Sequence, residues 1–174
     1  QTDEQIASQF VNDLLAAYIT ERQGKIELKI NQAVIAAAAQ PYEPPAAEGK
    51  LRIFVFGGSQ GAKAINSAVI DGLAEMAKKF TGLSITHQTG EADHARVVEA
   101  YRHAGISAEV VPFLYDMPTV LRAADLVVAR AGAMTIAELT ACGKPAILIP
   151  LPTAIYDHQM KNARAMEAAG GAVV

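Results

Sequence analysis

The chain has 174 residues, of which 51% are hydrophobic and 19% charged, and its formal net charge is −3. This length provides one ordinary domain with a buried core, and the composition excludes a disordered or fibrous chain. The acidic balance argues against a nucleic-acid partner, because neutralising phosphates requires a basic face.

Cysteine usage and hydropathy indicate the compartment. The single cysteine, Cys142, excludes an internal disulfide and is interpreted as a buried thiol near a helix end. We therefore expect a cytoplasmic protein. Apolar runs such as 146–151 are far shorter than the roughly 20 residues that span a bilayer. Because the chain begins with Gln1 and ends on a strand-like 170–174, we expect it to be part of a longer protein.

Residues 1–40 differ in pattern from the rest of the chain, and a proline-rich linker over 41–50 follows them. The elements expected in this segment are an amphipathic helix over 3–21, an alternating strand over 25–30 and an alanine-rich helix over 33–39. An exposed amphipathic helix beside a strand favours pairing, so residues 1–30 are a candidate homodimer contact.

Residues 51–174 alternate between apolar strand-like runs and helix-like stretches. The strand-like runs are 51–56, 83–87, 108–112, 125–129 and 145–149. This alternation predicts an α/β fold, a Rossmann-like parallel sheet with helices on both faces. Ligands of such sheets bind beyond the carboxyl ends of the strands, so the loops that follow the strands are the candidate sites.

The first of these loops holds Gly57, Gly58, Ser59 and Gly61 directly after a strand. Glycines let the backbone turn sharply and approach a ligand, and the N-terminus of the next helix favours a phosphate. The spacing fits neither the P-loop nor the dinucleotide fingerprint. A tight turn without a ligand remains an equally good interpretation of the loop alone.

The loop after 125–129 also opens a helix with small residues. The backbone N–H groups of Ala133, Met134 and Thr135 can face an anion there. Glu138 lies about one turn further on, where a carboxylate can accept two hydrogen bonds from a ribose diol. A nucleoside diphosphate satisfies both features, whereas the simpler alternative is that Glu138 only complements the helix dipole.

Two further loops are candidate binding segments. The loop 112–117 can hold a planar base through main-chain groups, or it is ordinary loop packing. In the segment 150–162, Asp157 is a candidate helix cap, and Gln159 and Asn162 can bind sugar hydroxyls.

The sequence gives little indication of catalysis. Without an Asp-x-Asp pair, an HExxH motif or a Cys/His cluster, no metal site and no cofactor are expected. Ser59 lacks a nucleophile elbow, so no catalytic residue is predicted. The histidines His87, His94 and His103 are interpreted as strand-end or surface residues.

The order and spacing of these motifs resemble the C-terminal, donor-binding domain of MurG-type transferases, which belong to glycosyltransferase family 28 and have the GT-B fold. The resemblance covers roughly 120 residues. The matching segments are 57–62, 87–90, 112–117, 124–128, 130–133, Thr135, Glu138, 143–146, 157–159 and 162–163.

The resemblance implies UDP-N-acetylglucosamine as the donor. It places uracil on the Leu114 backbone, the ribose hydroxyls on Glu138 and the sugar on Gln159. The diphosphate would lie on Ser59 and the amides of 133–135. The family transfers GlcNAc with inversion to lipid I, the undecaprenyl-linked muramyl-pentapeptide, at the cytoplasmic membrane face, and it does so without a protein-bound metal.

Two departures from the family bear on function. The N-terminal acceptor lobe is absent from this chain, so we expect no complete reaction without that lobe or a partner chain. The family also carries a donor-binding arginine between its lobes, whereas 27–32 here contains none. Two alternatives remain open: a subunit of a split GlcNAc transferase with a membrane partner, and a rearranged or engineered α/β scaffold without activity.

Overall fold

The computed structural model describes residues 51–79, 82–152 and 157–174. The helices, strand and linker expected within 1–50, and the homodimer contact assigned to 1–30, lie outside the described residues.

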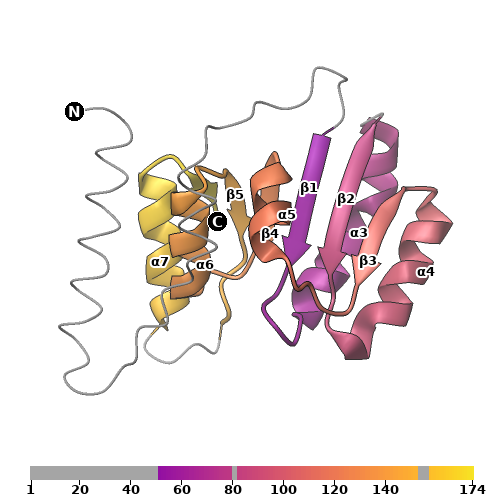
Figure 1. Ribbon diagram of the computed structural model, residues 1–174, viewed down its shortest axis with the longest axis horizontal. Coiled ribbons are helices and arrows are strands. Elements are labelled where there is room, and N and C mark those ends of the chain that lie inside the picture. The colour runs from indigo at the N-terminus through magenta and orange to yellow at the C-terminus, as the bar shows by residue number, and fades with distance from the viewer. Residues whose placement is uncertain (1–50, 80–81, 153–156) are drawn as a thin grey trace.

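Strands and helices alternate along the described chain (Figure 1). In chain order the elements are β1 (Leu51–Phe56), α3 (Lys63–Lys79), β2 (Leu83–Gln88), η1 (Glu91–Asp93), α4 (His94–Ala104), β3 (Ala108–Val111), α5 (Met117–Ala123), β4 (Leu126–Ala129), α6 (Ala133–Ala141), β5 (Ala146–Leu148), α7 (His158–Ala168) and β6 (Ala172–Val173). The five predicted strands are confirmed to within one residue at each end, and the strand-like end of the chain forms β6.

The six strands form one parallel sheet in the order β3-β2-β1-β4-β5-β6. The described part of the chain starts in the middle of the sheet with β1, moves outward through β2 and β3, and returns to the other side of β1 with β4. The strand order therefore reverses between β1 and β4, which is the switch point where open α/β sheets bind ligands. The predicted Rossmann-like α/β fold is confirmed.

The register brings the strand ends to one level. Phe56, the last residue of β1, pairs with Gln88 of β2 and with Ala129 of β4, each of which also ends its strand. The turns that follow these three strands consequently leave the same edge of the sheet side by side. The strand order and register thus bring together the turns after β1 and β4, although these strands end more than 70 residues apart in the sequence.

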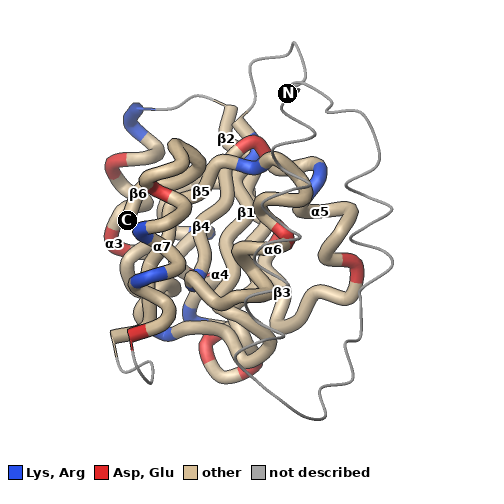
Figure 2. The backbone as a smooth tube through the Cα atoms, turned by 90° about the vertical axis from the view of Figure 1, so that its left-hand side faces the viewer, with Lys and Arg blue, Asp and Glu red and all other residues tan. Residues whose placement is uncertain are grey.

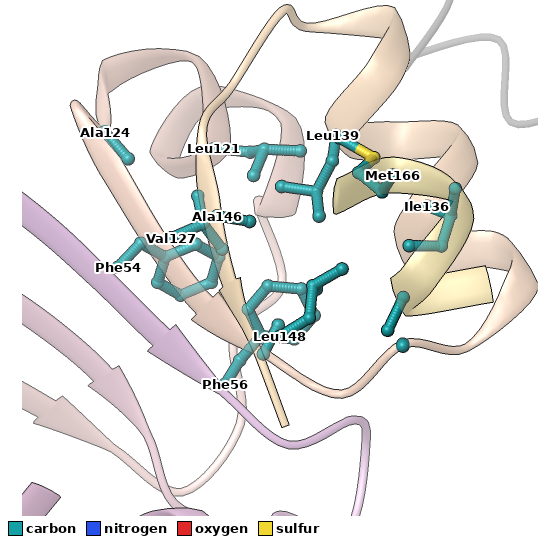
Figure 3. Close-up of a cluster of buried hydrophobic side chains, with 13 residues drawn as sticks. Phe54, Phe56, Leu121, Ala124, Val127, Ile136, Leu139, Ala146, Leu148 and Met166 are labelled. Carbon is teal, nitrogen blue, oxygen red and sulfur yellow. The ribbon is translucent and has the colours of Figure 1, made fainter. Parts of the chain in front are cut away.

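Each face of the sheet has its own apolar core, because successive side chains of a strand point to opposite faces. Ile53 and Val55 of β1 pack with residues of α3 and α4. Phe54 and Phe56 stack at 4.8 Å and pack with residues of α5, α6 and α7 (Figure 3). Complete burial of such a phenylalanine contributes roughly 1.5–3 kcal/mol, so these two clusters hold the helices on the sheet.

Charges are spread over the helices and loops with both signs interspersed, and no basic face is visible in Figure 2. One pair lies at the amino end of the sheet, opposite the switch-point turns. The Arg52 guanidinium donates to both carboxylate oxygens of Asp125 at 2.7 and 3.0 Å, which lowers the pKa of Asp125. This pair ties β1 to the start of β4.

Within the described ranges, every helix is too short or too polar to cross a membrane.

Candidate functional site

Two turns flank the switch point. The first, residues 57–61, joins β1 to α3, and the second, residues 130–132, joins β4 to α6. They leave adjacent parallel strands at the same level. Two glycine-containing turns that open helices therefore share one edge of the sheet, where unpaired backbone N–H groups favour an anion.

The inner side of the first turn is fixed by close backbone contact. Gly61 has a φ of 74°, and a Cβ on it would overlap the Thr89 carbonyl oxygen. A Cβ on Gly57 would overlap Ala62. Gly58 accepts a hydrogen bond from the Gln88 side chain at 2.8 Å. Glycine is thus required at 57 and 61, because the turn rests on neighbouring backbone.

The outer side of this turn is open. Gly58 has a φ of 95° with free space around its Cα, and Ser59 is exposed. The Ser59 hydroxyl has no imidazole or carboxylate hydrogen-bonded to it among the described residues. It can therefore donate to a ligand, but it has no base that would activate it as a nucleophile.

The second turn leaves a helix end without a cap. Gly132 is the N-cap of α6 and supplies no side-chain hydrogen bond. Ile136 is the first residue whose N–H bonds back, to Gly132 O at 3.0 Å. The N–H groups of Ala133, Met134 and Thr135 have no hydrogen-bond partner among the described residues. These are the three residues predicted to face an anion, and Met134 is 63% exposed.

Glu138 lies on the second turn of α6 and is half-buried. Burial raises the pKa of its carboxyl group, and no cation or donor in the described part of the chain offsets that effect. A half-buried carboxyl group without a protein partner is a candidate functional group, because desolvation is costly unless a ligand supplies hydrogen bonds.

Side chains from neighbouring segments hold the second turn in place. The Arg130 guanidinium donates to the carbonyl oxygens of Ile149 and Pro150 at 2.9 and 3.1 Å. The Asn162 amide donates to Ala131 O at 3.0 Å. One N–H of Asn162 therefore positions the second turn. The predicted contact between Asn162 and a sugar hydroxyl would use its second N–H or its oxygen, and it stays a prediction.

The loop after β3 returns along the carboxyl edge toward α5. Gly90 N donates to Pro112 O at 3.1 Å, and the Leu114 side chain packs against the apolar cluster that contains Phe56 and Ala131. Neither backbone group of Leu114 is hydrogen-bonded to another described residue. The free main-chain donor and acceptor expected at this position are present.

The start of α7 lies beside the same edge. Gln159 Oε1 accepts a hydrogen bond from Leu151 N at 2.9 Å, which leaves the Gln159 NH₂ group as a donor. Asp157 occupies the N-cap position, as predicted, with a left-handed φ of 57°. Its side chain makes no capping hydrogen bond, so the predicted capping role is wrong.

A buried polar network behind the first turn was missed by the sequence analysis. His87 Nε2 lies 3.0 Å from Asn66 Oδ1, and His87 Nδ1 lies 3.1 Å from the Tyr101 hydroxyl. All three side chains are at most 2% exposed. His87 is therefore a strand-end residue, as predicted, with its side chain buried, and His103 is an exposed surface residue, also as predicted.

The segment His87-Gln88-Thr89-Gly90 was the available signal for this network, since polar residues at the end of a buried strand require partners.

Cys142 lies at the C-cap of α6, near a helix end as predicted, but it is half-buried rather than buried. No cluster of three His, Cys, Asp or Glu side chains suited to a metal occurs within 51–79, 82–152 and 157–174. The site therefore offers backbone donors, a carboxyl group and amides, which is a binding chemistry for an anion with polar hydroxyls.

Comparison with known proteins agrees with this architecture. The family model for the glycosyltransferase family 28 C-terminal domain matches residues 52–174. A relative from Geotalea uraniireducens (strain Rf4) is 52% identical over 122 residues, covering 70% of this chain and 33% of the relative. A relative from Anaeromyxobacter sp. (strain K) is 49% identical over 131 residues, covering 75% of this chain and 34% of the relative.

Both relatives are named UDP-N-acetylglucosamine--N-acetylmuramyl-(pentapeptide) pyrophosphoryl-undecaprenol N-acetylglucosamine transferase. The chain spans about a third of the length of these curated relatives.

Solved structures show the same fold. The crystal structure of Acinetobacter baumannii MurG matches with a TM-score of 0.67 and 35% identity, covering 76% of this chain and 39% of that one. The kitacinnamycin glycotransferase, 21% identical with a TM-score of 0.53, covers 78% of this chain and 32% of its own and shares the fold. The chain belongs to glycosyltransferase family 28, as a MurG-like C-terminal domain.

Proposed function

We propose that residues 51–174 form the donor-binding domain of a GlcNAc transferase and bind UDP-N-acetylglucosamine. The observation that carries this proposal is the pairing, at the switch point, of an open glycine turn with the uncapped N-terminus of α6. A diphosphate supplies the acceptors that both segments lack, and a helix N-terminus stabilises its negative charge.

The remaining groups fit the other parts of the donor. The Glu138 carboxylate accepts hydrogen bonds from the ribose hydroxyls, and the free backbone groups of Leu114 pair with the uracil edge. Ser59 adds a donor to the diphosphate, and the free NH₂ group of Gln159 donates to the sugar. The names of the relatives support UDP-N-acetylglucosamine as the nucleotide sugar.

The whole reaction requires more than this domain. The relatives transfer GlcNAc to a lipid-linked muramyl-pentapeptide, according to their names, and this chain spans about a third of their length. We therefore propose that this chain alone binds the donor without turnover, and that an acceptor lobe completes the reaction on the cytoplasmic membrane face.

The surface of the carboxyl edge fits a covering lobe. Phe113 and Tyr115 are 44% and 92% exposed, and their rings pack edge to face at 5.0 Å. Met134, the second residue of α6, and Leu151, in the connection from β5 to α7, are 63% and 38% exposed. Large apolar side chains gathered on one functional edge indicate a contact surface. In the proposed organisation residues 1–40 and the linker 41–50 lie outside the donor domain.

Isothermal titration calorimetry of the chain with UDP-N-acetylglucosamine tests the proposal, with UDP-glucose and GDP-mannose as ligand controls. Glu138→Gln should weaken binding at least tenfold, about 1.4 kcal/mol. The carboxylate accepts hydrogen bonds at two charged oxygens, whereas the amide accepts at one neutral oxygen. Glu75→Gln, an exposed residue of α3, is the matched control and should bind as the unmodified chain does.

Absence of heat and of thermal stabilisation at millimolar UDP-N-acetylglucosamine would contradict donor binding. Equal binding of GDP-mannose would retain a nucleotide site but overturn the assignment of uracil to the Leu114 loop.

A further inference from the structure

The turn 57–61 is closed by a hydrogen bond from Gly61 N to Gly58 O at 2.9 Å, and backbone outside the turn supports it. It rests on the two residues that follow β2, since a Cβ on Gly61 would overlap Thr89 O and a Cβ on Gly90 would overlap Gln60 O. Together with the Gln88 side chain, which donates to Gly58 O, the positions of Thr89 and Gly90 therefore fix the position of the turn.

Thr89 and Gly90 are in turn held by hydrogen bonds on two sides. Toward β3, Thr89 N and Gly90 N donate to Val111 O and Pro112 O at 3.0 and 3.1 Å. Toward α3, Thr89 O accepts from Asn66 Nδ2 at 3.0 Å. The Asn66 bond therefore holds Thr89 and Gly90 against α3, the helix that follows the turn 57–61.

The direction of each hydrogen bond around Asn66 follows from its chemistry. The NH₂ group of Asn66 donates to Thr89 O and to Asp93 Oδ2, at 3.0 and 2.9 Å, so both of its protons are used. Its oxygen must then accept from His87 Nε2, which therefore carries the imidazole proton. His87 Nδ1 is left as an acceptor for the Tyr101 hydroxyl.

We propose that His87 is a positioning residue for the turn 57–61. Its neutral imidazole, with the proton on Nε2, orients the Asn66 amide, and Asn66 holds the Thr89–Gly90 backbone on which the turn rests. The effect of His87 on donor binding rests on the proposed function. Its effect on the geometry of the turn is independent of that function.

The surroundings keep the imidazole neutral. Burial lowers the pKa of His87 to about 4, and the opposing effect of Asp93 is smaller. Asp93 on η1 is itself paired with Arg96 of α4, with Lys63 of α3 as a second nearby cation.

Tyr101 of α4 also faces the ring, and burial raises the pKa of its hydroxyl, which stays protonated. Val55 and Val110, the strand neighbours of His87, are apolar. Protonation of the His87 ring would place a second proton on Nδ1, where it would face the hydroxyl proton of Tyr101. Acid should therefore disrupt the hydrogen bonds of the network and shift the turn 57–61 at the same time.

Two-dimensional ¹H–¹⁵N NMR of the full chain measures the tautomer of His87 and the amide positions of Gly58, Gly61 and Gly90. The proposal predicts the Nε2–H form near neutral pH. On acidification, the three glycine amides should shift along the same titration curve as the His87 ring. An Nδ1–H form, or glycine amides that do not follow the ring, would overturn the proposal, and this part requires neither a variant nor a ligand.

Two variants separate positioning from general stability. His87→Phe and Tyr101→Phe each remove the bond between Tyr101 and His87, but only His87→Phe also removes the bond to Asn66. His87→Phe should shift the glycine amides and weaken UDP-N-acetylglucosamine at least tenfold. Tyr101→Phe should leave the amides in place and the affinity within about twofold, and His87→Gln, which retains a donor for Asn66, should restore most of the affinity.

Equal effects of the two phenylalanine variants on affinity and on thermal stability would show a merely structural role and overturn the proposal. If the unmodified chain binds no UDP-N-acetylglucosamine, the proposed function fails, whereas the NMR arms still decide whether His87 positions the turn.

Discussion

The two turns at the switch point satisfy their polar groups in different ways. The turn 57–61 is supported from below by Thr89 and Gly90, and the side chains behind it form a closed network around Asn66 and His87. The turn 130–132 is held at its carbonyl side by Asn162, but it opens a helix whose first N–H groups have no partner among the described residues. The first turn thus has its backbone held by protein contacts on the inner side, whereas the helix end after the second turn has three N–H groups without a described partner.

This difference indicates a division of roles in binding. A backbone held in one position loses little conformational freedom when a ligand arrives, which favours affinity. Unpaired donors and a desolvated carboxyl group gain the most when the ligand supplies partners. The first turn therefore contributes shape, and the second turn with Glu138 contributes most of the polar attraction.

The largest expected effect comes from adding a methyl group to the turn 57–61. Gly61→Ala should destabilise the fold by about 3 kcal/mol or more, because the new Cβ meets Thr89 backbone and φ is positive. Gly72→Ala is the matched control, since Gly72 lies inside α3 with open space around it. Urea unfolding should show Gly72→Ala unchanged or up to about 1 kcal/mol more stable. Equal stability of the two variants would contradict the close backbone contact.

The buried network of His87, Asn66 and Tyr101 behind the turn 57–61 should make the stability of the fold sensitive to acid. The folded pKa of His87, about 4, lies below its ordinary value of 6.5, so the unfolded chain binds more protons between these values. Stability contributed by the neutral ring is present above pH 6.5, falls as the pH drops toward 4, and amounts to about 3 kcal/mol. Urea midpoints at pH 7, 5.5 and 4.5 measure the fall, and His87→Gln should flatten it. A slope unchanged in His87→Gln would show that other groups cause it.

Glu138 on α6 should make donor binding depend on pH. Burial raises the pKa of Glu138, so its carboxylate becomes protonated at a higher pH than an ordinary glutamate. UDP-N-acetylglucosamine affinity should fall as the pH drops through that value, by about tenfold or 1.4 kcal/mol. Calorimetry across this range should show the fall in the unmodified chain and its absence in Glu138→Gln. An identical pH profile in both proteins would exclude Glu138 as the titrating group.

The smallest expected effect comes from removing one N–H donor at the N-terminus of α6. Ala133→Pro deletes a single N–H at the first position of α6, where proline is tolerated and the extended Gly132 is compatible with it. Donor affinity should fall several-fold, about 1 kcal/mol, with the melting temperature unchanged. Ala133→Ser keeps the N–H group and is the control. Unchanged affinity in Ala133→Pro would remove this amide from the phosphate site.

The fold was predictable because its signals are local. Apolar runs such as 51–56 and 125–129 form strands of a parallel sheet that has helices on both faces, and the lengths of the runs match those of the strands. The turn glycines were equally visible, because a positive φ at Gly58 and Gly61 restricts the residue type. The candidate binding residues followed from their positions after strands and from the resemblance to the family.

The side-chain partners were not predictable in the same way. Asn162 looks like a ligand residue in the sequence, yet it bonds to Ala131, which is 31 residues away. His87 and Asn66 meet only because α3 packs on β2. A polar residue's partner depends on the packing of elements, and periodicity carries no information about it.

The central claim is that one ligand lies between the two turns. Mapping backbone amide shifts of the chain as UDP-N-acetylglucosamine is added tests this most directly. The account predicts saturable shifts at Gly58, Ser59, Leu114 and 133–135, with no change around the Arg52–Asp125 pair at the opposite edge of the sheet. Shifts confined to other surfaces, or none at millimolar ligand, would contradict it.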